Sequence, residues 1–166
     1  MNSSLVYLVQ TDTTVGFSSS SDEKLSLVKQ RPLSKKILNT VDSFSTLNKY
    51  VKVPKKFRKL VRNSKKTTFI YSNGNSFRVI DKKSDFYNFI NKFKILYSTS
   101  ANKSSKNFEE DFALDIAEVI VEDKKSLLKK EISQLPNGMQ LAIGATKNGC
   151  SIESDDRCFP FSRIIK

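Results

Sequence analysis

Histidine and tryptophan are absent from the 166-residue chain, and cysteine occurs only twice, at Cys150 and Cys158. Without histidine, neither a Ser-His nor a Cys-His catalytic arrangement is possible, and two thiols are too few for a common zinc site. Both cysteines are expected to be reduced thiols, because a disulfide between them would close only a short loop and cytosolic thiols stay reduced. The sequence therefore predicts neither of these enzyme classes nor a zinc protein.

Long apolar runs are missing as well. No run approaches the ~20 residues that cross a bilayer, and Met1 to Gln10 lacks the basic region and apolar core of a signal peptide. A cytoplasmic location is the resulting expectation. Apolar residues make up 38% of the chain, with 12 Phe and a mean hydropathy of -0.40, which fits a globular protein. The length predicts a single domain over residues 1–166.

Positive charge dominates the composition. The chain has 29 Lys and Arg against 17 Asp and Glu, a net charge of +12 and a pI near 9.7. Seven of the basic residues lie between Lys55 and Lys66, in a segment from Lys52 to Lys66 that contains a helix starting at Pro54. Such a surface attracts phosphates, so the expected partner is ATP, RNA or both, and charge alone does not choose between them.

The hydrophobic pattern predicts a mixed α/β (α+β-like) fold in which strands and helices interleave. Strands are expected near residues 4–9, 36–41, 67–71, 76–80, 94–97, 118–121, 140–145 and 161–165, with a turn at Asn73-Gly74 joining the third and fourth. Helices are expected after the caps at residues 20–22, 42–43 and 84–85, and near residues 108–116 and 126–133. Residues 11–16 and 98–102 are expected to be polar loops.

Three polar patches at predicted element ends carry chemistry that suits phosphate binding. They are Thr11-Asp12-Thr13-Thr14, Lys29-Gln30-Arg31-Pro32 and Ser98-Thr99-Ser100-Ala101-Asn102. Hydroxyl and backbone N–H groups bind phosphate oxygens, lysine supplies a compact charge, and arginine supplies a planar fork. Taken singly, each patch is also explained as a turn, a cap or a complement to a helix dipole.

The order and wording of these patches resemble the YrdC-like family, whose members carry Thr-Asp/Glu-Thr, then Lys-x-Arg-Pro, then Ser-Thr-Ser-Ala-Asn. The last motif matches in full. Between them, residues 65–69 lie where the family has a Gly-Pro-Val-Thr-like segment, and Ser76-Phe77-Arg78-Val79 resembles its Ala-Val-Arg-Val strand. Residues 150–152 and 162–164 resemble the family more weakly. The resemblance implies a twisted open mixed sheet with flanking helices.

The resemblance also implies an activity, the joining of L-threonine, bicarbonate and ATP into threonylcarbamoyl-AMP and pyrophosphate for transfer-RNA modification. Lys29 and Arg31 would neutralise the phosphates, while Ser100 and Asn102 would fix the nucleotide by hydrogen bonds. The implied catalytic residues are Lys29, Arg31, Ser100 and Asn102, and the implied ATP- and substrate-binding residues are Thr11, Thr13, Lys29, Arg31, Thr68, Arg78, Ser98, Ser100 and Asn102. Mg²⁺ would bridge the phosphates, with no metal ligand assigned in the chain. Proteins of the threonylcarbamoylation pathway are further implied partners.

Three departures from the family pattern keep other functions open. Gln10 replaces the usual proline, Val15 replaces an aromatic residue, and Lys65-Lys66 replaces Gly-Pro. One alternative is therefore a paralogue that binds nucleotide or double-stranded RNA without synthesis, and another is a subunit whose basic segment docks an acidic protein. Lys29 and Arg31 are expected to be exposed at a helix end and to share one cavity with Ser100 and Asn102.

Overall fold

The computed structural model describes residues 1–104, 106–122, 141–143 and 163–165. All described strands belong to one mixed sheet in the order β4-β5-β3-β6-β2-β1-β7-β9-β8. The strands are β1 (Tyr7–Gln10), β2 (Val15–Ser19), β3 (Leu38–Val41), β4 (Phe69–Ile70), β5 (Ser76–Val79), β6 (Ile95–Ser100), β7 (Val119–Glu122), β8 (Leu141–Ile143) and β9 (Arg163–Ile165). The β1–β7 and β3–β5 pairs are parallel and the other pairs antiparallel. The predicted α/β class with an open mixed sheet is confirmed.

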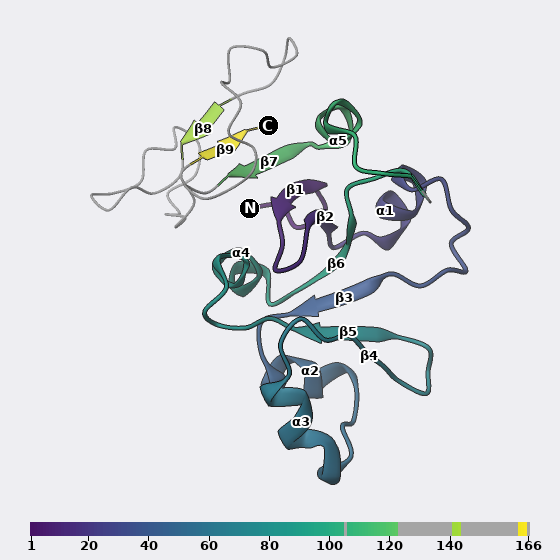
Figure 1. The fold of residues 1–166 in the computed structure, drawn as a ribbon, viewed down its shortest axis with the longest axis vertical. Helices are drawn as coiled ribbons and strands as arrows, with labels where there is room; N and C mark the ends of the chain where they lie inside the picture. The colour runs from purple at the N-terminus through teal and green to yellow at the C-terminus, as the bar shows by residue number, and fades with distance from the viewer. Residues whose placement is uncertain (105, 123–140, 144–162, 166) are drawn as a thin grey trace.

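Helices flank this sheet (Figure 1). They are α1 (Asp22–Val28), α2 (Phe44–Tyr50), the 3-10 turn η1 (Lys55–Phe57), α3 (Arg58–Asn63), α4 (Asp85–Phe93) and α5 (Glu110–Ile116). Serine caps start the first two, because the Ser21 hydroxyl accepts from the Lys24 N–H at 3.2 Å and the Ser43 hydroxyl accepts from the Thr46 N–H at 3.1 Å. None of the helices in the described part of the chain has the length and apolarity that a bilayer crossing requires.

The two faces of the sheet carry different helices. On one, which we call the α4 face, Phe86, Phe89 and Ile90 of α4 pack against Tyr7 and Leu96. The opposite face, which we call the α1 face, is covered by α1 and α5 over Leu8 and Phe17, and by α2 and α3 over Val41 and Phe77. Successive strand residues point to opposite faces of the sheet, so they contribute in turn to the two cores.

Parts of the two predicted loops, residues 15–16 of the first and residues 98–100 of the second, belong to strands in the structure. Residues 15–19 form β2, which pairs with β1 on one side and β6 on the other. Residues 98–100 extend β6 to Ser100. Both segments contain two serines, a residue typical of loops, but Ser18 and Ser19 are fully buried between neighbouring strands. Backbone pairing on both sides satisfies these segments and overrides their weak strand propensity.

Other predictions agree with small shifts of boundary. The hairpin turns at Asn73-Gly74, where Gly74 has φ of 76°, and β4 and β5 pair antiparallel. In the basic segment, the turn η1 follows Pro54 and α3 begins at Arg58. The helix predicted near residues 126–133, and Cys150 and Cys158, lie outside the described residues.

Candidate functional site

The C-terminal end of α1 is shaped by an unusual backbone conformation. Gln30 has φ of 48°, in the left-handed region. The Arg31 N–H donates to the Ser26 carbonyl at 3.1 Å, and the Gln30 N–H donates to the Leu27 carbonyl at 2.9 Å. These two bonds make a Schellman motif, which closes the helix and turns the chain sharply between Lys29 and Arg31. Glycine is usual at this position, so Gln30 carries backbone strain beside the candidate site.

Lys29 reaches from this helix end to the end of β6. Its ammonium donates to the Ser100 carbonyl at 2.9 Å, to the Asn102 Oδ1 at 2.9 Å, and to the Asn102 carbonyl. The Ser100 hydroxyl lies 3.4 Å away. In return, the Ser104 hydroxyl donates to the Lys29 carbonyl at 2.7 Å. This network joins Lys29 to residues that lie 71 to 75 positions further along the chain.

The expectation that Lys29 is exposed is wrong. The residue is only 5% exposed, because its side chain lies under residues 100–104 and its head is surrounded by oxygen acceptors. Burial, together with the nearby charge of Arg31, lowers the pKa of Lys29 below its ordinary value of 10.5. Lys29 therefore positions Ser100 and Asn102, and its ammonium has no donor left for a ligand unless one of these bonds breaks.

Arg31 and Asn102 differ in whether their side-chain polar atoms have hydrogen-bond partners. Among the described residues, no acceptor binds the buried Nε of Arg31. Asn102, in contrast, accepts from Lys29 with its oxygen and donates from its amide nitrogen to the Lys106 carbonyl. The alternative of a simple turn over residues 98–102 is therefore wrong, because residues 98–100 belong to β6 and Asn102 bonds Lys29 and Lys106. A buried guanidinium donor without acceptor is rare and makes Arg31 the freer group.

A small hollow of about 210 Å³ lies on the α4 face beside the end of β6. Its wall is formed by the loop after β1 and by side chains of β3, β5 and β6. The residues that line it are Thr11, Asp12, Thr13, Thr14, Gly16, Leu38, Thr40, Arg78, Ser98, Thr99 and Ser100. Of the predicted binding residues, Thr11, Thr13, Arg78, Ser98 and Ser100 meet here. Lys29, Arg31, Thr68 and Asn102 lie outside this lining, although Lys29 contacts Ser100 from behind.

Arg78 organises the wall of the hollow. Its guanidinium donates to Asp12 at 3.1 Å, to the Thr13 hydroxyl at 3.3 Å and to the Thr68 hydroxyl at 3.0 Å. The side chains of Asp12 and Arg78 are 6% and 16% exposed, so the ion pair is shielded from water. Asp12 neutralises Arg78, and an anion entering the hollow would compete with this carboxylate.

The loop after β1 presents hydroxyls at a fixed distance from β6. The Thr11 hydroxyl accepts from the N–H groups of Thr13 and Thr14 and donates to the Thr14 carbonyl at 2.6 Å, which closes the loop. At the next strand, Gly16 allows close approach, because a Cβ there would lie 2.8 Å from the Thr99 carbonyl oxygen. The absence of a side chain therefore lets β2 and β6 pack tightly under the hollow.

A second hollow of about 570 Å³, with three Lys and three Asp in its lining, adjoins the first. The two share Thr11 and Asp12 in their walls, and the second is also lined by Lys65, Lys66 and Lys83. Alone, the smaller hollow lies below the ~300 Å³ typical of small-molecule sites. Together the two give space for a phosphorylated ligand beside a row of lysines, of which Lys65 is paired with Asp81 at 2.8 Å.

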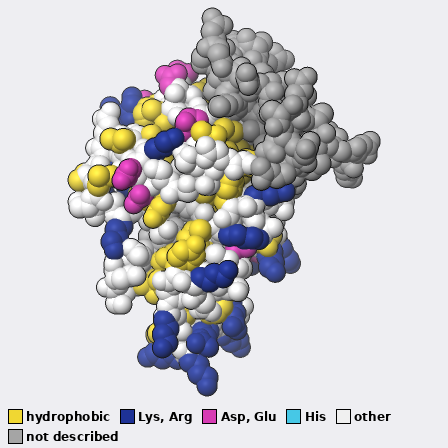
Figure 2. Space-filling view, turned by 180° about the vertical axis from the view of Figure 1, so that it is seen from behind, with side chains coloured by type: hydrophobic (Ala, Val, Ile, Leu, Met, Phe, Trp, Pro, Cys, Tyr) yellow, Lys and Arg dark blue, Asp and Glu magenta, His cyan; other side chains and the backbone are white. Residues whose placement is uncertain are grey.

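Charge is strongly uneven along the chain. From Ser43 to Ile80 there are ten Lys and Arg and no Asp or Glu. Figure 2 shows Lys and Arg side chains gathered at the end of the molecule that α2, η1 and α3 form in Figure 1. Phe57 and Leu60, which belong to this basic end, are 45% and 55% exposed. The basic end continues through Lys65 and Lys66 into the larger hollow on the α4 face.

Some residues of the site were not among those predicted. Asp12 pairs with Arg78, and Thr40 and Leu38 line the hollow from β3. Asp12 lies within the Thr-Asp-Thr motif, so the motif itself was a signal for it. Thr40 belongs to no motif, and only the order of the strands brings it to the hollow. Its hydroxyl donates to the Leu96 carbonyl at 3.0 Å.

The residues of the site do not form a metal cage. Among the described residues, no group of three or more Asp, Glu or Cys side chains could hold an ion together. Asp12 is the one carboxylate in the lining of the small hollow, and Arg78 engages it. Magnesium is usually held by one or two carboxylates together with substrate phosphates.

Comparisons with protein-family models, with curated proteins and with solved structures find no match to this chain.

Proposed function

We propose that the chain is a YrdC-like, threonylcarbamoyl-AMP synthase-like nucleotidyltransferase that acts in the cytoplasm on ATP, L-threonine and bicarbonate. The observation that carries the proposal is the convergence of three separate motifs. Lys29 of the second motif holds Ser100 of the third, and Ser100 lines one hollow with Thr11 and Thr13 of the first. These positions lie up to 89 residues apart, between Thr11 and Ser100, so a shared hollow is not a consequence of sequence proximity.

In the proposed reaction, a carbamate oxygen made from threonine and bicarbonate attacks the α-phosphorus of ATP. The new O–P bond forms as the bond to pyrophosphate breaks. Arg78 would stabilise the developing negative charge from the wall of the hollow, with the hydroxyls of Thr13 and Ser100 orienting the reacting groups. Arg31 lies outside the lining of this hollow, so its Nε, which has no acceptor among the described residues, takes no part in the step. Magnesium would add charge neutralisation when bound with the phosphates.

The test is threonine-dependent release of pyrophosphate from ATP in the presence of bicarbonate. The wild-type chain is expected to release pyrophosphate, and Ser100→Ala and Arg78→Gln are expected to lose about 10-fold or more of this rate. Ser72→Ala in the exposed hairpin turn is the matched control for the serine, and Lys82→Ala is the control for the cation. A folded wild-type chain that releases no pyrophosphate would refute the synthase proposal.

The uneven charge favours a second candidate, an RNA-binding paralogue without synthase activity. The nine Lys and Arg of residues 43–66, a stretch without Asp or Glu, form a surface that matches a phosphodiester backbone. Asp12 on Arg78 also weakens the smaller hollow as an anion site. In this case, the affinity for double-stranded RNA would fall steeply as the salt concentration rises. A triple variant, Lys55→Ala, Lys56→Ala and Lys59→Ala, would lower the slope of log affinity against log salt concentration by up to about three. Binding to an acidic protein but not to RNA would favour the docking-subunit alternative instead.

A further inference from the structure

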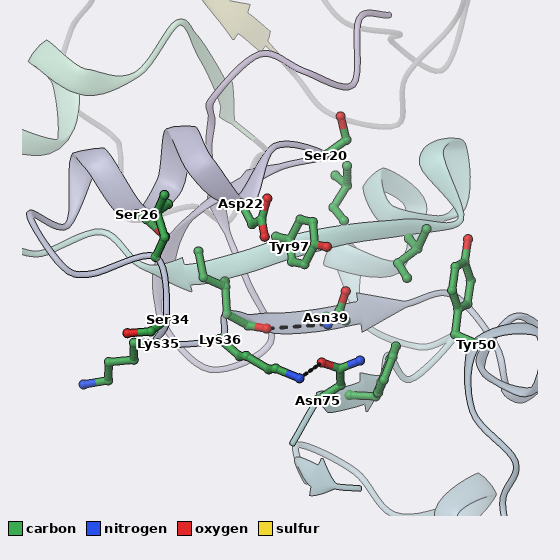
Figure 3. Close-up of a pocket in the computed structure, with 15 residues that line it drawn as sticks. Ser20, Asp22, Ser26, Ser34, Lys35, Lys36, Asn39, Tyr50, Asn75 and Tyr97 are labelled. Atoms are coloured by element: carbon green, nitrogen blue, oxygen red, sulfur yellow. Dashed lines mark hydrogen bonds between the residues drawn. The ribbon is translucent and has the colours of Figure 1, made fainter. Parts of the chain in front are cut away.

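A hollow with a polar and aromatic lining lies outside the proposed synthase site, on the opposite, α1 face of the sheet. It has a volume of about 520 Å³ and is enclosed by α1, α2, the loop before β3 and the β4–β5 hairpin (Figure 3). Strand alternation separates the two sites. Leu38, Thr40 and Arg78 face the α4 side, whereas Asn39, Phe77 and Tyr97 face the α1 side.

The floor of this hollow suits a flat, partly apolar group. Phe77 is 3% exposed and lies between Tyr71 and Tyr50, whose ring centroid is 6.4 Å from that of Phe77. Ile95 and Tyr97 continue the floor along β6. Tyr50 is 54% exposed, because its ring stands at the edge of the hollow and part of it has no protein cover. An exposed ring over a buried aromatic floor is the usual setting for stacking a base.

The Asn39 side-chain oxygen in the hollow selects for a hydrogen-bond donor on the ligand. The Asn39 amide nitrogen donates to the carbonyls of Ile37 and Ser76, which fixes the orientation of the amide. Its oxygen then faces Tyr97 in the hollow, and within the described part of the chain no hydrogen bond engages it (Figure 3). Asn39 is only 9% exposed, so a ligand that fills the hollow must supply an N–H or O–H to this oxygen.

The rim of the hollow has one positive side and one acidic side. Lys36 donates to Asn75 Oδ1 at 2.8 Å and to the Asn73 carbonyl, and its neighbour Lys35 is exposed. Asp22 and Ser20 stand across the hollow at the start of α1 (Figure 3). A single phosphate matches the lysine side, and sugar hydroxyls match the carboxylate and serine side.

We propose that this hollow is a binding site for an adenine nucleoside monophosphate, distinct from the synthase site and independent of whether the chain is a synthase. The base would stack at Tyr50, its exocyclic amine would donate to the Asn39 oxygen, and its phosphate would lie at Lys35. A nucleotide of this size fits a volume of about 520 Å³. Inosine monophosphate has the same shape but carries an oxygen in place of the amine, so it would set two acceptors against each other at Asn39.

The experiment measures AMP and IMP binding to the full chain by isothermal titration calorimetry. Wild-type protein is expected to bind one AMP and to bind IMP at least about 10-fold more weakly. This comparison needs no substitution, so it stays decisive if a variant fails to fold. Equal affinities for AMP and IMP, or no AMP binding, would overturn the proposal.

Variants on the two faces then locate the nucleotide. Tyr50→Ala is expected to weaken AMP binding about 10- to 100-fold, and Lys35→Ala several-fold, against Lys82→Ala as the exposed control. Arg78→Gln, on the α4 face, is expected to leave AMP binding unchanged while it lowers pyrophosphate release. If Arg78→Gln removes AMP binding and Tyr50→Ala does not, the nucleotide lies in the synthase site and the proposal for the α1 face fails.

Discussion

Replacing Lys29 with methionine tests whether its ammonium holds the end of β6 in place. Methionine keeps much of the apolar stem, but it leaves the Ser100 carbonyl and both oxygens of Asn102 without their donor. Hydrogen bonds to a charged group contribute about 1.5–3 kcal/mol each, but they are not additive, and water can replace part of the loss at Asn102. Removing the ammonium also removes its desolvation cost, which offsets the loss further. We expect a net destabilisation of about 2–4 kcal/mol.

The assay is chemical or thermal unfolding of Lys29→Met beside Lys82→Met, whose side chain is exposed. For a chain of this size, each kcal/mol lowers the melting temperature by about 2–4 °C, so Lys29→Met should melt about 5–15 °C lower. The control should stay within about 0.5 kcal/mol of wild type. Equal stability of the two variants would refute the reasoning, because it would mean that the network around Lys29 contributes nothing.

The lowered pKa of Lys29 gives the same residue a pH signature. Burial and the nearby Arg31 charge lower this pKa in the folded state, below the ordinary value of 10.5. Between the lowered pKa and 10.5 the unfolded chain binds more protons than the folded chain, so the contribution of this group to stability rises as pH rises. The stability of wild type relative to Lys29→Met should therefore increase through this window. If the stability difference between wild type and Lys29→Met became smaller in this pH window, the burial of Lys29 would be contradicted.

Three further substitutions address the backbone and charge of the site. Gly16→Ala should destabilise the fold by about 1–3 kcal/mol, because the new Cβ would lie 2.8 Å from the Thr99 carbonyl oxygen, and a denaturant melt equal to wild type would contradict this close approach. Gln30→Gly should stabilise by up to about 1 kcal/mol by relieving the left-handed conformation, as read from the same melts. Asp12→Asn should strengthen pyrophosphate binding several-fold by freeing Arg78, and weaker binding by calorimetry would argue against Arg78 as the anion contact.

The sequence predicts most helices and the hairpin, because their signals are local. Ser21 and Ser43 cap helices within three residues of their partners, and Asn73-Gly74 supplies the left-handed turn that the hairpin needs. Strand β2 could not be predicted in this way. Val15–Ser19 is a strand because β1 and β6 pair with it on both sides, and those partners lie outside any local window.

The environment of Lys29 shows the same limit at the site. Lysine is seldom buried, so exposure at a helix end is the natural prediction from its sequence context. Its acceptors belong to residues 100 and 102, more than 70 positions further along the chain. The motifs named Lys29, Ser100 and Asn102, but only the packed structure shows that Lys29 bonds the other two from outside the hollow. It also shows that the Arg31 Nε has no acceptor among the described residues.

The alternation of β3 links the two hollows and limits how they can be tested. Thr40 faces the α4 side of the sheet and Asn39 faces the α1 side. A shift of one residue in the pairing of β3 would exchange these faces and disrupt both sites. This register is fixed from both edges, by antiparallel pairing with β6 and parallel pairing with β5. A substitution within β3 that loosens the register would therefore lower binding on both faces and identify neither site. Arg78 on β5 lines only the hollow on the α4 face, and Tyr50 on α2 lines only the hollow on the α1 face. Arg78→Gln should therefore lower pyrophosphate release alone, and Tyr50→Ala should lower AMP binding alone. This pair of results would separate the two sites, which no substitution in β3 can do.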